Sequence, residues 1–165
     1  MTRLSSLAVV AIAILAMPVT AQEPRWVSAW AASHNVGLGV AGLSGSTVRL
    51  IARPTISGQS LRVKLTNIRG NAPAVFSAAF IGRSGSGAAV APGTNRQMTV
   101  GGAASFTLPA EESLWTDPIP FEVRAFERLV VSLDVVSASD VSMDTLALVS
   151  TYRADGHHAA APRDG

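Results

Sequence analysis

The feature that most constrains the fold is a regular alternation of apolar and polar side chains with a period of two residues. In the segment 61–66, Leu, Val and Leu alternate with Arg, Lys and Thr, and a similar alternation runs through 47–53. This period places apolar side chains on one face of a β-strand and polar side chains on the other. Pro54 ends the first segment because proline cannot donate a ladder hydrogen bond. We therefore predict two half-buried strands, paired antiparallel, with charged side chains such as Arg49 facing water.

Several later segments also have the composition of short strands bounded by turn-forming residues. Segment 74–83 is apolar on both faces, which indicates a central strand, and Gly101-Gly102 suits a tight hairpin turn that needs positive φ. The other expected strands lie within 96–109, 111–123, 128–137 and 145–154. No amphipathic helix is evident after the first 21 residues. Eight or nine short strands predict an all-β fold, an antiparallel β-sandwich, and a jelly roll is one topology that fits them.

The N-terminal 21 residues have the features of a secretory signal peptide. Arg3 supplies the positive charge, residues 7–17 form the apolar region, and small residues precede a cleavage site after Ala21. An uncleaved membrane anchor is the alternative, but the apolar run is shorter than the ~20 residues that span a bilayer. We predict a secreted or periplasmic protein with no membrane contact after cleavage. A β-sandwich domain would then occupy 22–154, followed by a disordered tail or linker at 155–165.

Composition excludes several classes of function. The chain of 165 residues carries 13 basic and 11 acidic side chains, and the basic ones are scattered rather than clustered. Nucleic-acid binding needs a concentrated positive surface, so we predict no nucleic-acid partner. The chain contains no cysteine. Disulfides, thiol catalysis and cysteine-ligated metal sites are therefore excluded.

The residues that usually carry hydrolytic chemistry do not form a complete set. The Gly- and Ser-rich stretches 42–46 and 82–87 lack the G-x-S-x-G spacing of a nucleophile elbow. His157 and His158 follow Asp155, but adjacent residues on a tail make a poor metal site. Glu111 and Glu112 are neighbours, whereas glycosidases need two carboxylates that face each other. We therefore identify no catalytic residue, no metal site and no cofactor.

The candidate binding residues are Trp30, His34 and Trp115. Exposed indole rings could stack on sugar rings, and His34 lies between a Trp-containing segment and a Gly-rich loop, where it could line a groove. The alternative is structural, because Trp26, Trp30 and Trp115 would be valuable core residues in a chain with only 5% aromatic residues. We favour core positions for the tryptophans and a surface or capping role for His34. Any small ligand at these residues would be a carbohydrate or an ester substrate.

Three stretches together resemble a known family. They are "WVSAWAASHN", the stretch from "TVRLIARP" to "FIGR", and "SFTLPAEESLWTDPIPFEVRAFERLVVSLDV", which together cover most of residues 25–153. The layout is similar to the N-terminal β-domain that precedes the catalytic domain in secreted bacterial SGNH/GDSL-type hydrolases. The stretch "LRVKLTNIRGNAP" is the most specific piece, with a strand that ends in Thr-Asn followed by Gly and Pro.

The resemblance implies an esterase or lipase partner rather than an active site in this chain. Members of the family continue into a catalytic domain with a Gly-Asp-Ser block, an oxyanion-hole Gly and Asn, and a late Asp-x-x-His. The sequence contains no Gly-Asp-Ser, so none of these roles is assigned to a residue here. We expect a non-catalytic accessory domain, or a fragment, whose partner is an SGNH-type catalytic domain. A secreted carbohydrate-binding module is the alternative function.

Overall fold

The structure is a computed structural model that describes residues 25–39, 42–144 and 149–163. The described residues form β-strands and no helix, which confirms the predicted all-β fold. The described strands are β1 Val36–Leu38, β2 Ser46–Ala52, β3 Gly58–Leu61, β4 Lys64–Thr66, β5 Ala74–Arg83, β6 Arg96–Met98, β7 Phe106–Leu108, β8 Ser113–Trp115, β9 Ile119–Val123, β10 Leu129–Ser137, β11 Val141–Met143 and β12 Thr151–Asp155. The predicted signal peptide, residues 1–21, lies outside the described residues. No helix long and apolar enough to cross a membrane occurs in the part of the chain that the structure describes.

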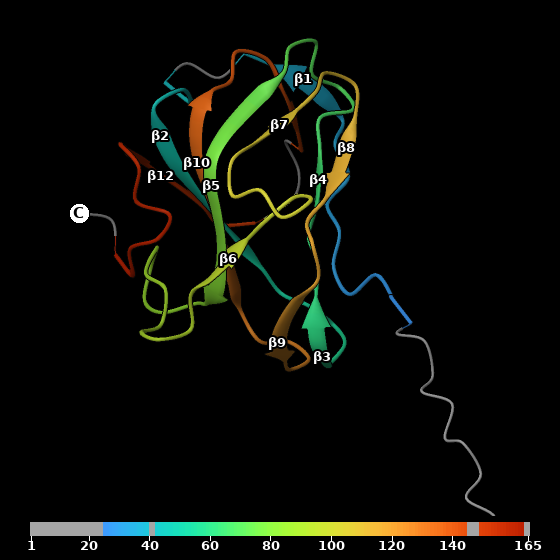
Figure 1. The fold of residues 1–165 in the computed structure, drawn as a ribbon, viewed down its shortest axis with the longest axis vertical. Helices are drawn as coiled ribbons and strands as arrows, with labels where there is room; N and C mark the ends of the chain where they lie inside the picture. The colour runs from blue at the N-terminus through green and yellow to red at the C-terminus, as the bar shows by residue number, and fades with distance from the viewer. Residues whose placement is uncertain (1–24, 40–41, 145–148, 164–165) are drawn as a thin grey trace, which may run out of the picture.

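The first layer of the sandwich is a six-stranded antiparallel sheet. Its strands follow the order β12-β2-β10-β5-β6, and β7 also pairs with β5 (Figure 1). The predicted central position of segment 74–83 is confirmed, since β5 pairs with β10 on one edge and with β6 and β7 on the other. In β10, the four residues expected to face inward all belong to the main core, namely Leu129, Val131, Leu133 and Val135.

The second layer consists of two-stranded antiparallel sheets, β3-β9 and β4-β8, and a further pair, β1-β11, lies at one end (Figure 1). Strand β9 alternates between buried and exposed residues along its whole length. Its buried side chains Ile119, Phe121 and Val123 pack in the same cluster as the inward side chains of β5 and β10. The two layers therefore share one hydrophobic core, as expected for a β-sandwich.

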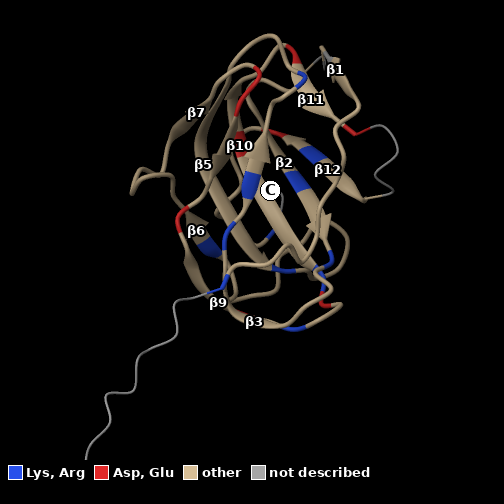
Figure 2. Ribbon diagram, turned by 90° about the vertical axis from the view of Figure 1, so that its right-hand side faces the viewer, with Lys and Arg blue, Asp and Glu red and all other residues tan. Residues whose placement is uncertain are grey.

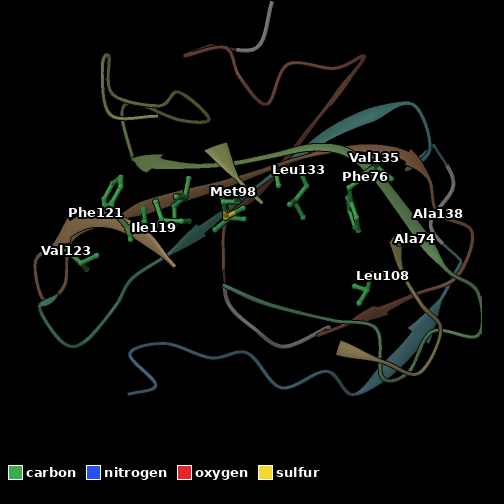
Figure 3. Packing of buried hydrophobic residues seen from close by; sticks show 14 residues of the cluster. Ala74, Phe76, Met98, Leu108, Ile119, Phe121, Val123, Leu133, Val135 and Ala138 are labelled. Atoms are coloured by element: carbon green, nitrogen blue, oxygen red, sulfur yellow. The ribbon is translucent and has the colours of Figure 1, made fainter. Parts of the chain in front are cut away.

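The core is mostly aliphatic. Figure 3 shows its side chains in the space between the layers, with Met98 near the middle. The rings of Phe76 and Phe106 have centroids 5.3 Å apart and are tilted by 36°, a favourable geometry for an aromatic pair. Burial of each large apolar side chain contributes about 1.5–3 kcal/mol. Fourteen buried members are sufficient to hold the layers together without disulfides.

The predicted pairing of segments 47–53 and 61–66 is wrong. Strand β2 pairs with β10 and β12, whereas β4 pairs with β8 in the other layer. The connection around residues 53–57 crosses from one layer to the other, so the two segments never become neighbours in a sheet. The period of two gave the faces of each strand correctly but held no information on its partner.

The sequence predicted that the polar face of β2 faces water, and this prediction is wrong. Arg49 is 1% exposed and is the largest fully buried side chain among the described residues. Its Nη1 donates to Ala88 O at 2.8 Å, and its Nη2 donates to His158 O at 2.9 Å and to Ala161 O at 2.6 Å. The guanidinium thus joins the sheet to two segments that are distant in the sequence. Elsewhere Lys and Arg are distributed over several strands and loops (Figure 2).

The disorder predicted for the tail from residue 155 is also wrong, as far as residue 163. Ala159 is completely buried. The main-chain N–H groups of His158 and Ala159 donate to Oδ1 of the buried Asp134, at 3.0 and 2.9 Å. Val90 N–H donates to Pro162 O at 2.8 Å. Residues 156–163, which we call the C-terminal strap, therefore cover the outer face of the first layer.

The tight turn expected at Gly101-Gly102 is present, but the flanking strands β6 and β7 each pair with β5 and are joined to each other only by an isolated bridge between Val100 and Ala103. Val100 and Ala103 exchange two main-chain hydrogen bonds of 3.0 and 3.1 Å around this turn. The two glycines have φ values of 57° and 81°, the positive values that a two-residue hairpin turn requires. Their N–H groups donate to the carboxylate of Asp117. This links the turn to the chain just before β9.

Candidate functional site

The stretch most specific to the family resemblance has a structural role. Asn67 follows β4 and is 1% exposed. Its Nδ2 donates to Ala72 O at 2.8 Å and to Pro109 O at 3.2 Å, and its Oδ1 accepts from Ser142 N–H at 3.0 Å. One side chain therefore ties together the turn after β4, the approach to β8, and β11.

Close packing around Gly70 explains why this stretch contains a glycine. A Cβ atom on Gly70 would lie 2.0 Å from Asn67 Oδ1 and 2.8 Å from Asp140 O, distances that no side chain tolerates. Gly70 N–H also donates to Asn67 O at 3.0 Å. The Thr-Asn-x-x-Gly pattern thus fits the structural requirements of this corner.

The core positions favoured for the three tryptophans are wrong. Trp26, Trp30 and Trp115 are 36%, 42% and 47% exposed. Trp115 is the last residue of β8, on the outward side of the second layer, and Leu114 takes the inward side. Trp26 and Trp30 belong to an N-terminal segment that passes along the second layer without joining a strand. The aliphatic side chains were sufficient to fill the core, which left the indoles available at the surface.

Two of these rings share one cation. The Cζ of Arg62 lies 4.7 Å from the ring centroid of Trp26 and 4.2 Å from that of Trp115, over both ring faces. Lys64 Nζ lies 5.8 Å from the Trp115 centroid. Lys64 and Trp115 are directly opposite each other in the β4-β8 ladder. We call these four residues the Trp–Arg face. Sequence analysis missed Arg62 and Lys64, although the alternation did place both on the outward side of one strand.

Trp30 belongs to a second exposed group, at the end of the sandwich near β3 and β9. Main-chain bonds bring its segment there, because Thr55 N–H donates to Ala29 O at 2.8 Å and Phe126 N–H donates to Pro54 O at 2.6 Å. Ile56 and Phe126 are 45% and 60% exposed. We call Trp30, Ile56 and Phe126 the apolar end.

Phe126 has an unusual backbone conformation. Its φ of 64° lies in the left-handed region, which bulky side chains rarely adopt. Such a conformation costs about 1–3 kcal/mol and persists only where neighbouring contacts hold it. The contacts here are the Pro54 bond and a bond from Arg53 Nε to Phe126 O at 3.0 Å. The backbone is therefore constrained in a way that leaves a large apolar ring in solvent.

His34 lies apart from the Arg62 contacts, near β11. Ser33 N–H donates to Asp144 Oδ2 at 3.1 Å, and Asn35 N–H donates to Met143 O at 3.0 Å, which fix the backbone on both sides of His34. Partial burial lowers the pKa of His34 below 6.5, and the nearby Asp144 carboxylate opposes this shift. The structure does not place the imidazole beside Trp115 or Arg62 in any hydrogen bond or ion pair.

The remaining candidates are dispersed over the surface. His157 is exposed, and His158 has its Nε2 2.9 Å from Asp155 O. Glu111 lies in the corner organised by Asn67, where its N–H donates to Asn67 O and Gly70 O. Within the described ranges, no group of three or more His, Asp or Glu side chains is arranged to hold a metal ion. The described hydrogen bonds also include none between a hydroxyl group and a histidine ring.

Comparison with known proteins did not extend this picture. No family model matches the chain, and no curated protein matches its sequence. The resemblance to the N-terminal domain of SGNH/GDSL-type hydrolases therefore stays a prediction from the sequence.

Proposed function

We propose that this chain is a non-catalytic docking domain of a secreted SGNH/GDSL-type esterase or lipase. The observation that carries the proposal is the apolar end, where Trp30, Ile56 and Phe126 are 42–60% exposed on three segments joined by main-chain hydrogen bonds. Clusters of exposed large apolar side chains mark protein interfaces, and tryptophan is enriched among the residues that dominate binding. The sequence resemblance supports a hydrolase domain as the partner.

The strained backbone of Phe126 adds support. A flexible loop would relieve a φ of 64° at low cost, but two hydrogen bonds to the 53–54 segment hold it. Rigid presentation of an apolar ring reduces the conformational entropy that is lost on association. The apolar end is thus preorganised for contact with a partner.

The test is reconstitution with an SGNH-type catalytic domain expressed as a separate chain. We expect a complex by calorimetry and higher turnover of p-nitrophenyl esters than with the catalytic domain alone. Truncation of an interface anchor costs 2 kcal/mol or more, so Phe126→Ser should weaken binding by roughly 30-fold. Ile68→Ser is the matched control, because Ile68 is 53% exposed but follows β4.

Two results would contradict the proposal. One is equal weakening by Phe126→Ser and Ile68→Ser, which would show that the apolar end is not the contact. The other is ester hydrolysis by this chain alone, since that would make it a catalyst in its own right.

A secreted carbohydrate-binding module is the second candidate, and Trp115 favours it. This indole is 47% exposed on an outward strand face, and an accessible aromatic ring can stack against a sugar ring. Retention on insoluble polysaccharides that is lost in Trp115→Ala would support this function. Retention on no glycan would exclude it and leave the docking proposal untouched, since the two depend on different residues.

A further inference from the structure

Arg62 is held in place by two aromatic rings. Its guanidinium lies over the faces of Trp26 and Trp115, at 4.7 and 4.2 Å from the ring centroids. Cation–π contacts of this kind contribute roughly 0.5–1 kcal/mol each at exposed sites. They also restrict a side chain that would otherwise lose about 2 kcal/mol of rotamer entropy on binding. The planar N–H fork of Arg62 is therefore preorganised before any ligand arrives.

Among the residues that the structure describes, no hydrogen bond or ion pair is formed by the side chain of Arg62 or of Lys64. Arg83, by contrast, has a protein partner, because its Nε donates to Glu127 Oε1 at 2.5 Å. Arg62 lies just before β4 and Lys64 is its first residue, and the two cations lie 4.2 and 5.8 Å from the same Trp115 ring centroid. Such a pair attracts an anionic ligand.

Hydroxyl groups also lie beside this pair. On the same outward side of β4 and β8, Ser113 Oγ donates to Thr66 Oγ1 at 2.8 Å, two pairs of residues along the ladder from Lys64 and Trp115. The site thus combines a half-exposed indole, two cations and two hydroxyl groups on β4, β8 and the residue pair before β4. A ligand that fits has carboxylates for the cations, hydroxyl groups for Ser113 and Thr66, and an apolar part for the portion of the Trp115 ring that Arg62 leaves exposed.

We propose that the Trp–Arg face binds a linear acidic polysaccharide, with Arg62 receiving the carboxylate of a uronic acid residue. A guanidinium fork matches a carboxylate through two parallel N–H···O bonds. The inference rests on the second candidate function and specifies its ligand. An acidic peptide would also offer carboxylates, but it has no use for the indole face beside two hydroxyl groups.

The experiment measures binding of the full chain to polygalacturonate by calorimetry and by indole fluorescence. We expect saturable binding that weakens as salt is raised and falls about tenfold or more in Arg62→Gln, the loss expected for a charge-assisted hydrogen bond. Arg62→Lys keeps the positive charge but not the planar N–H fork, so its affinity for polygalacturonate should lie between those of the native chain and Arg62→Gln. Arg96→Gln is the matched control, because Arg96 is exposed in the other layer and bonds only to nearby main-chain carbonyls.

The outcomes separate the claims. Equal affinity for a neutral polysaccharide, with no effect of Arg62→Gln, would overturn this inference and keep the second candidate. Equal Arg62-dependent binding of polyglutamate would identify a peptide receptor instead of a glycan site. Binding of no polysaccharide would overturn both the inference and the second candidate. Circular dichroism of each variant checks that a loss is not due to unfolding.

Discussion

Replacement of Arg49 by methionine tests whether the C-terminal strap is part of the folded domain. Arg49 is 1% exposed and donates three hydrogen bonds, one to Ala88 O and two to the strap, at His158 O and Ala161 O. Methionine fills a similar space but donates nothing. Three main-chain carbonyls would then lose their donor in a partly buried region.

The expected loss follows from these contacts. A hydrogen bond to a charged group contributes about 1.5–3 kcal/mol, so these three bonds together contribute at most about 9 kcal/mol. The strap can leave the sheet and rehydrate its carbonyls, and the variant avoids burying a charge, so the actual loss is smaller. We expect the free energy of unfolding to fall by about 3–5 kcal/mol, which corresponds to about 1–2 kcal/mol for each carbonyl that loses its donor. The melting temperature should fall by roughly 10 °C or more.

Urea unfolding followed by circular dichroism gives the free energy, and amide hydrogen exchange locates the effect. The N–H groups of His158 and Ala159, bonded to Asp134 in the native chain, should exchange faster in Arg49→Met. Arg53→Met is the control. Arg53 follows β2, is exposed and donates one exposed bond to Phe126 O, so it should cost less than about 1 kcal/mol.

The reasoning fails if Arg49→Met is within about 1 kcal/mol of the native chain while the strap amides keep their protection. That result would mean that the Asp134 and Val90 hydrogen bonds and apolar burial hold the strap without Arg49. If stability falls while amide hydrogen exchange in the strap is unchanged, the stabilising contact of Arg49 is its bond to Ala88 O rather than its bonds to the strap.

Three further changes probe the fold. Asn67→Ala should cost about 2–4 kcal/mol in urea unfolding because it leaves buried main-chain groups unpaired, whereas the exposed neighbour Ile68→Ala should stay within about 0.5 kcal/mol. Gly102→Ala should cost about 1–2 kcal/mol through its φ of 81° alone, since nothing lies within 4 Å of the added Cβ; an equal effect at Gly45, which also has positive φ and open space, would be consistent. The Thr99 hydroxyl and then the turn N–H groups lower the pKa of Asp117, so stability from this carboxylate is complete above its unfolded pKa and is lost as pH falls through the folded one. Thermal melts of Asp117→Asn should therefore show a flatter acid limb than the native chain; identical limbs would count against this assignment.

Local patterns in the sequence were sufficient for the class of fold and several strands. The apolar positions of 128–137 identified the inward side of β10, and the two apolar faces of 74–83 identified β5 as central. The glycine pair at 101–102 identified a tight turn because its requirement for positive φ is local. Each of these inferences depends on residues that are neighbours in the chain.

The tertiary structure decided what covers each face. A period of two separates the side chains of β2 into two sets, but it cannot show that the strap, more than 100 residues later, buries Arg49. Nor could composition show that aliphatic residues fill the core and leave Trp26 and Trp115 at the surface beside Arg62. Strand pairing, burial of polar groups and the sharing of one cation by two rings all depend on contacts between segments distant in sequence. For that reason only the folded chain revealed the Trp–Arg face and the apolar end.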